Sequence, residues 1–285
     1  MRKKVVAIMS MVAVVVFGVM LSGCQIQHHD QSEASSNEYI KETPLVVLHG
    51  TPADEHTWDT FVEDVKQVKG VVMEPLLRVS KDGEVKMEGK WQDGEFPVIL
   101  LHFDNNNAPD HDQGAWLANV FMYLKRMGIR QVNFLGHSSG GVAMAYYLAE
   151  QQYKMDGRAV EINKVMTLGS PYNELDVDKN PSGNNGRDVT ITNTLATIQR
   201  GFEDHHIEVK SWDNIAGNLN GKIDNIVPIG SVECLNPLLE EKHIPYEYKE
   251  MDKHSHSDLH ETTEMLTMMK QYFFNQSTQD DASKK

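Results

Sequence analysis

The sequence predicts an α/β fold, with a mostly parallel central sheet that helices cover on both faces. Short apolar runs of strand length alternate along the chain with longer amphipathic stretches of helical period. Most apolar runs are nearly continuous, as in strands that are buried on both faces. One run ends in a tight, glycine-bearing turn, and a helix-forming segment follows at once, which is a third sign of this class.

The expected strands are short and rich in Val, Ile, Leu and Phe. The stretch 71–88 alternates apolar and polar residues around Lys-Asp-Gly-Glu at 81–84, which predicts a hairpin. The other expected strands are 44–48, 96–103, 131–135, 162–168, 208–216 and 246–250.

The expected helices connect these strands. Apolar residues recur at helical spacing from Trp116 to Met127, and Gly128 then ends the helix. Further helices are expected at 58–68, 142–151 and 259–274. The segment 172–200 is rich in Asn, Gly and Asp and breaks the alternation, so it predicts either a loop or a small lid beside the functional site.

The two ends of the chain differ from the rest. Residues 1–23 combine a basic start, an uncharged apolar run and Leu-Ser-Gly before Cys24, which predicts a secretory signal whose end resembles a bacterial lipobox. Cys24 would then carry lipid and anchor the protein to the outer face of the membrane. An uncleaved anchor helix is the alternative. Residues 24–43 are expected to form a flexible tether, 44–275 the folded domain and 276–285 a polar tail.

The charge and the cysteine content of the chain argue against polyanionic partners and against a disulfide bond. The formal net charge of −14 disfavours nucleic acid and other polyanionic partners. The chain has two cysteines, and lipidation of Cys24 would leave Cys234 alone, which excludes an intramolecular disulfide in the mature protein. Cys234 lies in an apolar segment and is expected to be a small core residue.

The tight turn after the strand 131–135 reads Gly-His-Ser-Ser-Gly at 136–140, a G-x-S-x-G pattern. A strand before this pattern and a helix after it are the context of a nucleophile elbow. Gly136 and Gly140 keep Cβ atoms out of the sharp turn, so that the hydroxyl of Ser138 is exposed at the edge of the sheet. Ser138 is therefore the candidate nucleophile.

A serine nucleophile needs a base and an acid, which are expected later in the chain, in the order carboxylate and then histidine. Asp224 follows a predicted strand and precedes a Val-Pro turn, so it is the candidate acid, although an Asx-turn alone would also explain it. Asp213 is the rival, within a predicted strand. The candidate base is His256, which follows the last predicted strand, with His254 and then His260 as the rivals.

Two backbone N–H groups are expected to form an oxyanion hole. The first buried strand ends in His-Gly at 49–50, so the N–H of Thr51 is the first candidate donor, and the N–H of Ser139 is the second. The histidine-rich segment 254–260 also comes close to a zinc-binding pattern, but it has one extra residue and no usual ligand set downstream. We therefore expect neither a metal nor an organic cofactor.

Several segments together resemble the α/β-hydrolase superfamily and, within it, the DUF915-type cell-surface hydrolases of Gram-positive bacteria. The segments are LHG at 48–50, DGEVKMEG at 82–89, GHSSGG at 136–141, LGSPYN at 168–173, IDNIVP at 223–228 and HSDLHE at 256–261. The resemblance implies that the first histidine of the last segment, His256, is catalytic. Ser139 stands where the family usually has Met, and 51–54 is not the Gly-rich loop that commonly follows HG.

The expected function is that of a serine hydrolase outside the cytoplasm, a carboxylesterase or lipase that acts on a small-molecule or lipid ester through an acyl-enzyme. An amidase or acyltransferase would use the same three residues. A non-catalytic surface-binding lipoprotein that kept the fold is the alternative from another class. The sequence carries no readable code for the substrate, the acyl-chain length or the oligomeric state.

Overall fold

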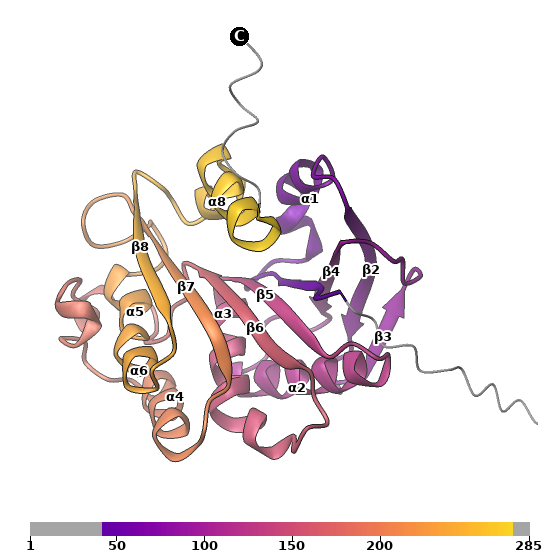
Figure 1. Ribbon diagram of the computed structural model, residues 1–285. Helices are drawn as coiled ribbons and strands as arrows, with labels where there is room; N and C mark the ends of the chain where they lie inside the picture. The colour runs from indigo at the N-terminus through magenta and orange to yellow at the C-terminus, as the bar shows by residue number, and fades with distance from the viewer. Residues whose placement is uncertain (1–41, 276–285) are drawn as a thin grey trace, which may run out of the picture. The chain divides into compact units, whose positions relative to one another are not determined.

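A computed structural model describes residues 42–275 of this chain, and Figure 1 shows their arrangement. An eight-stranded sheet in the order β3-β2-β4-β1-β5-β6-β7-β8 forms the centre. All neighbouring strands pair in parallel except β2 and β3, which form the antiparallel hairpin that the sequence predicts. The strands are β1 (Leu45–Leu48), β2 (Val71–Val79), β3 (Val85–Glu88), β4 (Phe96–Phe103), β5 (Gln131–His137), β6 (Glu161–Leu168), β7 (Val209–Asn218) and β8 (Tyr246–Asp252).

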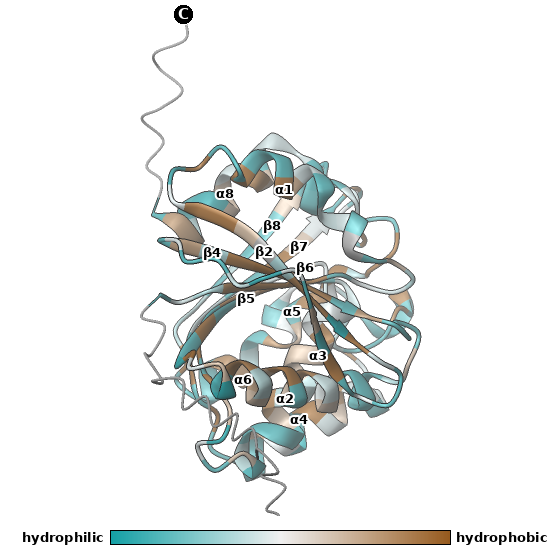
Figure 2. Cartoon of the chain, turned by 90° about the vertical axis from the view of Figure 1, so that its right-hand side faces the viewer, coloured by the Kyte–Doolittle hydropathy of each residue, from teal (hydrophilic) through white to brown (hydrophobic). Residues whose placement is uncertain are grey.

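Helices cover both faces of the sheet, as Figure 2 shows from the side. One face carries α1 (Asp59–Val65), α7 (Asp258–Glu261) and α8 (Thr263–Phe274). The other carries α2 (Asp110–Arg126), α3 (Ser139–Tyr146), α4 (Asn193–Asp204), α5 (Ile229–Glu233) and α6 (Asn236–Glu241). This arrangement confirms the predicted fold class.

The central strand β1 shows why its residues are almost all apolar. Val46 and Leu48 pack into the core under α2 and α3, whereas Leu45 and Val47 pack into the core under α1 and α8. All four side chains are buried, because successive residues of a strand point to opposite faces and both faces are covered here. Within residues 42–275, no helix has the length and apolarity that a bilayer span requires.

Two predicted segments differ in detail from the structure. The helix expected at 259–274 is two helices, because Thr262 between α7 and α8 has an extended backbone with φ −74° and ψ 148°. The segment 172–200, expected to be a loop or a small lid, contains two short helical turns, Val177–Lys179 and Asn184–Gly186, and the start of α4, and none of its residues lines the cavity with Ser138. The amide groups of the buried Asn173 and Asn180 hydrogen-bond each other at 2.8 Å, and Asn173 also bonds the main chain at Thr190 and Thr192.

The predicted signal, the lipidation site Cys24 and the tether up to residue 41 lie outside the described residues, as does the predicted polar tail 276–285. Cys234 is buried and its thiol donates to the main-chain oxygen of Ser231 at 3.3 Å. Burial raises the pKa of this thiol, so it is not a reactive thiolate at neutral pH.

Candidate active site

The candidate nucleophile Ser138 occupies the turn between β5 and α3. Its backbone has φ 54° and ψ −127°, a combination that is unfavourable for any residue with a side chain. The packing of the turn explains its glycines. A Cβ atom on Gly140 would lie 2.7 Å from the main-chain oxygen of His49, and one on Gly136 would lie 2.8 Å from the nitrogen of Gly141. Only glycine fits at these two positions while the turn keeps this shape.

The end of β1 closes over the same turn. A Cβ atom on Gly50 would lie 2.5 Å from the Cβ of Ser138 and 3.1 Å from the main-chain oxygen of His137, so no side chain fits at position 50. The next residue, Thr51, places its hydroxyl 2.9 Å from the hydroxyl of Ser139. Ser139 is the first residue of α3, so its N–H has no acceptor within the helix and lies at the positive end of the helix dipole. The two residues whose N–H groups are the predicted oxyanion donors are therefore in side-chain contact.

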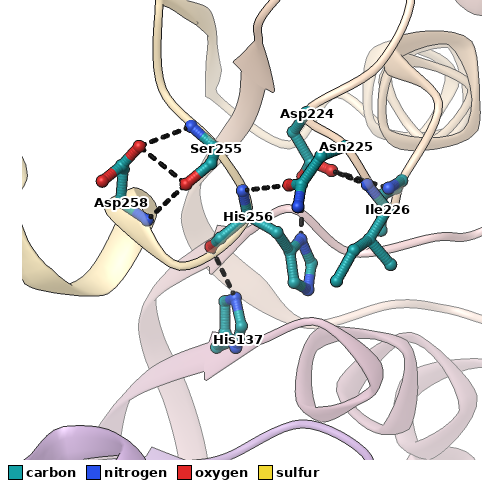
Figure 3. Close-up of polar contacts among 8 residues, drawn as sticks. His137, Asp224, Asn225, Ile226, Ser255, His256 and Asp258 are labelled. Atoms are coloured by element: carbon teal, nitrogen blue, oxygen red, sulfur yellow. Dashed lines mark hydrogen bonds and ion pairs between the residues drawn. The ribbon is translucent and has the colours of Figure 1, made fainter.

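Asp224 and His256 form a direct, buried pair. The Nδ1–H of His256 donates to Oδ2 of Asp224 at 2.8 Å, and Figure 3 draws both residues. The other oxygen, Oδ1, accepts from the N–H groups of Ile226 at 2.9 Å and Val227 at 2.6 Å. These bonds hold the carboxylate, which is fully buried. Because Nδ1 of His256 carries the shared proton, its Nε2 is left as the acceptor in the neutral ring.

The rival residues have other partners. Asp213 lies in β7 beside Tyr272, and burial together with the nearby Glu247 raises its pKa to about 6. His254 directs Nδ1 to the main-chain oxygen of Asp252 at 2.9 Å and Nε2 to the hydroxyl of Thr262 at 3.1 Å. The side-chain partners of Asp213 and His254 thus differ from the pair formed by Asp224 and His256.

Two residues that the sequence did not single out hold the main chain of His256. The Nε2–H of His137 donates to the carbonyl oxygen of His256 at 3.1 Å, and the N–H of His256 donates to Oδ1 of Asn225 at 3.0 Å. His137 is the residue before Ser138, and Asn225 is the residue after Asp224. Both belong to the motifs quoted above, but the motifs alone do not say which main-chain group each side chain would bind.

Three imidazole rings pack together beside the turn. The ring of His137 lies 4.4 Å from that of His256 and 4.6 Å from that of His260. Burial, and then the neighbouring rings of His256 and His260, lower the pKa of His137 well below its ordinary value. Burial and the nearby His256 lower the pKa of His260 to about 4. His137 and His260 are therefore neutral at pH 7.

Ser138 and His256 line one cavity of about 310 Å³. The cavity lies between the loop after β1, the turn after β5 and the α7 region, and no residue of 172–200 lines it. A larger groove of about 560 Å³ lies along β7, β8 and α8 and shares no lining residue with this cavity. The smaller cavity is the candidate active site, because of the two it alone is lined by the elbow serine and by His256, whose ring is bonded to Asp224 behind the wall.

The geometry does not support the zinc pattern in the segment 254–260. Among residues 42–275, no three His, Cys, Asp or Glu side chains converge as metal ligands. The histidines 254 and 256 have the partners given above, and Asp258 accepts from the N–H and the hydroxyl of Ser255 at 2.8 Å and 2.6 Å.

The sheet, the strained turn and the helix that follows it are the features of an α/β hydrolase. The chain belongs to the family described as alpha/beta hydrolase of unknown function (DUF915), whose model matches residues 32–276. No curated protein matches the sequence.

Solved structures share this fold. The product of the gene lin2722 from Listeria innocua has a TM-score of 0.72 and 23% identity, over 84% of this chain and 96% of that one. A "putative cell surface hydrolase" from Lactobacillus plantarum WCFS1 has a TM-score of 0.66 and 22% identity, over 84% of this chain and 94% of that one. At these identities, the likeness establishes the common fold.

Proposed function

We propose that this protein is a serine hydrolase that cleaves carboxylic esters, with Ser138 as the nucleophile, His256 as the general base and Asp224 as its acidic partner. One observation carries the proposal. A histidine that is hydrogen-bonded to a buried carboxylate at 2.8 Å lines the same cavity as a serine in a strained strand–turn–helix elbow. A base that is held in one tautomer and lines the same cavity as a serine hydroxyl is the arrangement that can activate serine.

In the proposed reaction, Nε2 of His256 takes the proton of the Ser138 hydroxyl while Oγ attacks the ester carbonyl. The carboxylate of Asp224 stabilises the imidazolium that forms. The N–H groups of Thr51 and Ser139 stabilise the oxyanion, and each such donor contributes about 3 kcal/mol to barrier lowering in comparable enzymes. The imidazolium then protonates the leaving alcohol, and water releases the acyl group by the same steps.

The proposed location is outside the cytoplasm, with the domain anchored through lipid on Cys24. The basic start, apolar run and Leu-Ser-Gly-Cys of the sequence support this proposal. The cell-surface description of the Lactobacillus plantarum protein agrees with it. A lipid-anchored hydrolase would meet ester substrates at the membrane surface or in the medium around the cell.

Steady-state hydrolysis of p-nitrophenyl butyrate by the full chain tests the reaction. We expect Ser138→Ala, His256→Gln and Asp224→Asn each to lower kcat by about 10⁴-fold or more. Asp213→Asn is the matched control, because it changes the rival carboxylate outside the cavity in the same way. A Ser138→Ala variant that hydrolyses the ester at the wild-type rate would refute the proposal.

A further inference from the structure

The wall of the candidate active site has an unusual composition for a pocket that would hold a lipid. Its lining consists of Gly50, Thr51, Ala53, Thr57, His137, Ser138, His256, Ser257, His260 and Glu261. No Leu, Ile, Val, Met or Phe is among them, although ligand pockets are lined predominantly by hydrophobic and aromatic side chains. Placing a long alkyl chain against this wall would remove water from polar groups without replacing their hydrogen bonds.

The small size of the cavity also argues against a long acyl chain. Its volume of about 310 Å³ lies at the lower end of the range of roughly 300–1,000 Å³ for small-molecule sites. No residue of 172–200 lines it, so that segment adds no apolar channel to it. The space therefore suits a short acyl group and a compact alcohol.

The charge on the wall is negative. Glu261, at the end of α7, is the only Asp or Glu among the lining residues, and none of them is Lys or Arg. His137 and His260 are neutral at pH 7 because burial lowers the pKa of each. The chain as a whole has a formal net charge of −14. Such a wall attracts cations and repels anions.

We propose that this cavity takes short-chain esters that carry a positively charged group, and not long-chain or anionic lipid esters. The inference rests on the proposed function and names the substrate class of the same site. In a bound ester of this kind, the cationic group lies toward Glu261 while the carbonyl carbon faces Ser138.

The first test is a chain-length series with p-nitrophenyl acetate, butyrate, octanoate and decanoate, each kept below the concentration at which it aggregates. We expect kcat/KM to be highest for acetate or butyrate and to fall at least about tenfold from butyrate to decanoate, a difference of about 1.4 kcal/mol. A decanoate value equal to or above that of butyrate would overturn the proposal, because it would require an apolar acyl site.

The second test compares butyrylcholine with 3,3-dimethylbutyl butyrate, a neutral ester of nearly the same shape. We expect the cationic ester to have a kcat/KM about twofold to fivefold higher at low ionic strength, as for a partly exposed charge pair, and the ratio to fall toward one at high salt. Glu261→Gln should bring the ratio to about one. Glu241→Gln, which makes the same charge change on α6 across the sheet, should keep it.

Two results would contradict the charge preference. One is a wild-type ratio of one or less, and the other is a ratio that Glu261→Gln leaves unchanged. Labelling by a fluorophosphonate probe separates these results from a failure of the proposed function. A chain that labels at Ser138 and hydrolyses neutral short esters without charge preference refutes only the substrate class, whereas a chain that neither labels nor hydrolyses any ester refutes both.

Discussion

The Nε2–H of His137 donates a hydrogen bond to the main-chain carbonyl of His256 at 3.1 Å, although the two residues are 119 positions apart. His137 directly precedes Ser138, so this bond ties the turn that carries the proposed nucleophile to the loop that carries the proposed base. The N–H of His256 donates both to Oδ1 of Asn225 and to the main-chain oxygen of Asp224, each at 3.0 Å. The neighbours of the two other proposed catalytic residues thus fix the main chain of His256 at both of its polar groups.

We expect the bond from His137 to affect the rate more than the binding of substrate. His137→Phe keeps a ring of similar size but removes the donor, so the loop that carries His256 loses one restraint. A base displaced by a fraction of an ångström loses much of its effect, and we expect kcat to fall about tenfold or more with little change in KM. His137→Gln can place an amide N–H near the position of Nε2 and should recover part of the loss. Equal kcat values in the two variants would show that the bond does not position His256.

The role of the Asn225 side chain can be tested with a glycine variant, because the backbone at this position suits glycine. Its φ of 93° favours glycine. Asn225→Gly should therefore keep the fold and lose one of the two acceptors of the His256 N–H, while the main-chain oxygen of Asp224 at 3.0 Å stays in place. We expect a lower kcat and little change in the free energy of unfolding. Asn225→Ala adds backbone strain to the same loss and should be less stable by about 1 kcal/mol. Urea denaturation and p-nitrophenyl butyrate kinetics measure the two effects. A glycine variant with wild-type kcat would leave no role for the Asn225 side chain in the reaction.

The lowered pKa of His260 predicts an acid-sensitive fold. Because its pKa is about 4 in the folded chain and about 6.5 in an unfolded one, only the unfolded chain gains this proton as the pH falls between those values. Stability is therefore lost as the pH falls from 6.5 toward 4, by about 2 kcal/mol from this residue at pH 4.5. His260→Gln should be relatively more stable at pH 4.5 than at pH 7.5, compared with wild type in urea unfolding. A difference between variant and wild type that does not change with pH would contradict this.

The raised pKa of Asp213 predicts a contribution to stability that changes with pH in the opposite direction. Burial and Glu247 raise its pKa to about 6, so the folded chain holds a proton that the unfolded chain releases near pH 4. The resulting stability is present at low pH and is lost as the pH rises through 6. Asp213→Asn removes this term. We expect the variant to gain about 1 kcal/mol over wild type between pH 4.5 and pH 8, a value discounted because the side chain is only partly buried. No gain with rising pH would mean that the carboxylate is well solvated.

The sequence alone predicts the elbow, because the steric constraint on this turn involves only residues that are close together in the chain or packed against its main chain. A strand must turn within a few residues, and the close approach of main chains at Gly136 and Gly140 admits no side chain. The order of strands and helices is readable for a similar reason, since burial on both faces requires the continuous apolar runs of β1, β4 and β5.

The side-chain contacts of the candidate site cannot be predicted from the sequence in this way, because they join residues that are far apart in the chain. His254, His256 and His260 share one segment, and the contact that distinguishes His256 comes from Asp224, 32 residues earlier. The sequence does not indicate the break at Thr262, because the apolar period continues across it. The sequence does not indicate how the segment 172–200 is held, because its structure depends on amide hydrogen bonds of buried asparagines, which leave no periodic signal.

The most direct measurement is the mass of the covalent adduct that the full chain forms with a fluorophosphonate, followed by peptide mapping of its position. The account predicts one adduct per chain, on Ser138, and a labelling rate that falls by orders of magnitude in His256→Gln. An adduct on a different residue, or an unlabelled chain whose circular dichroism spectrum shows it to be folded, would contradict the central claim.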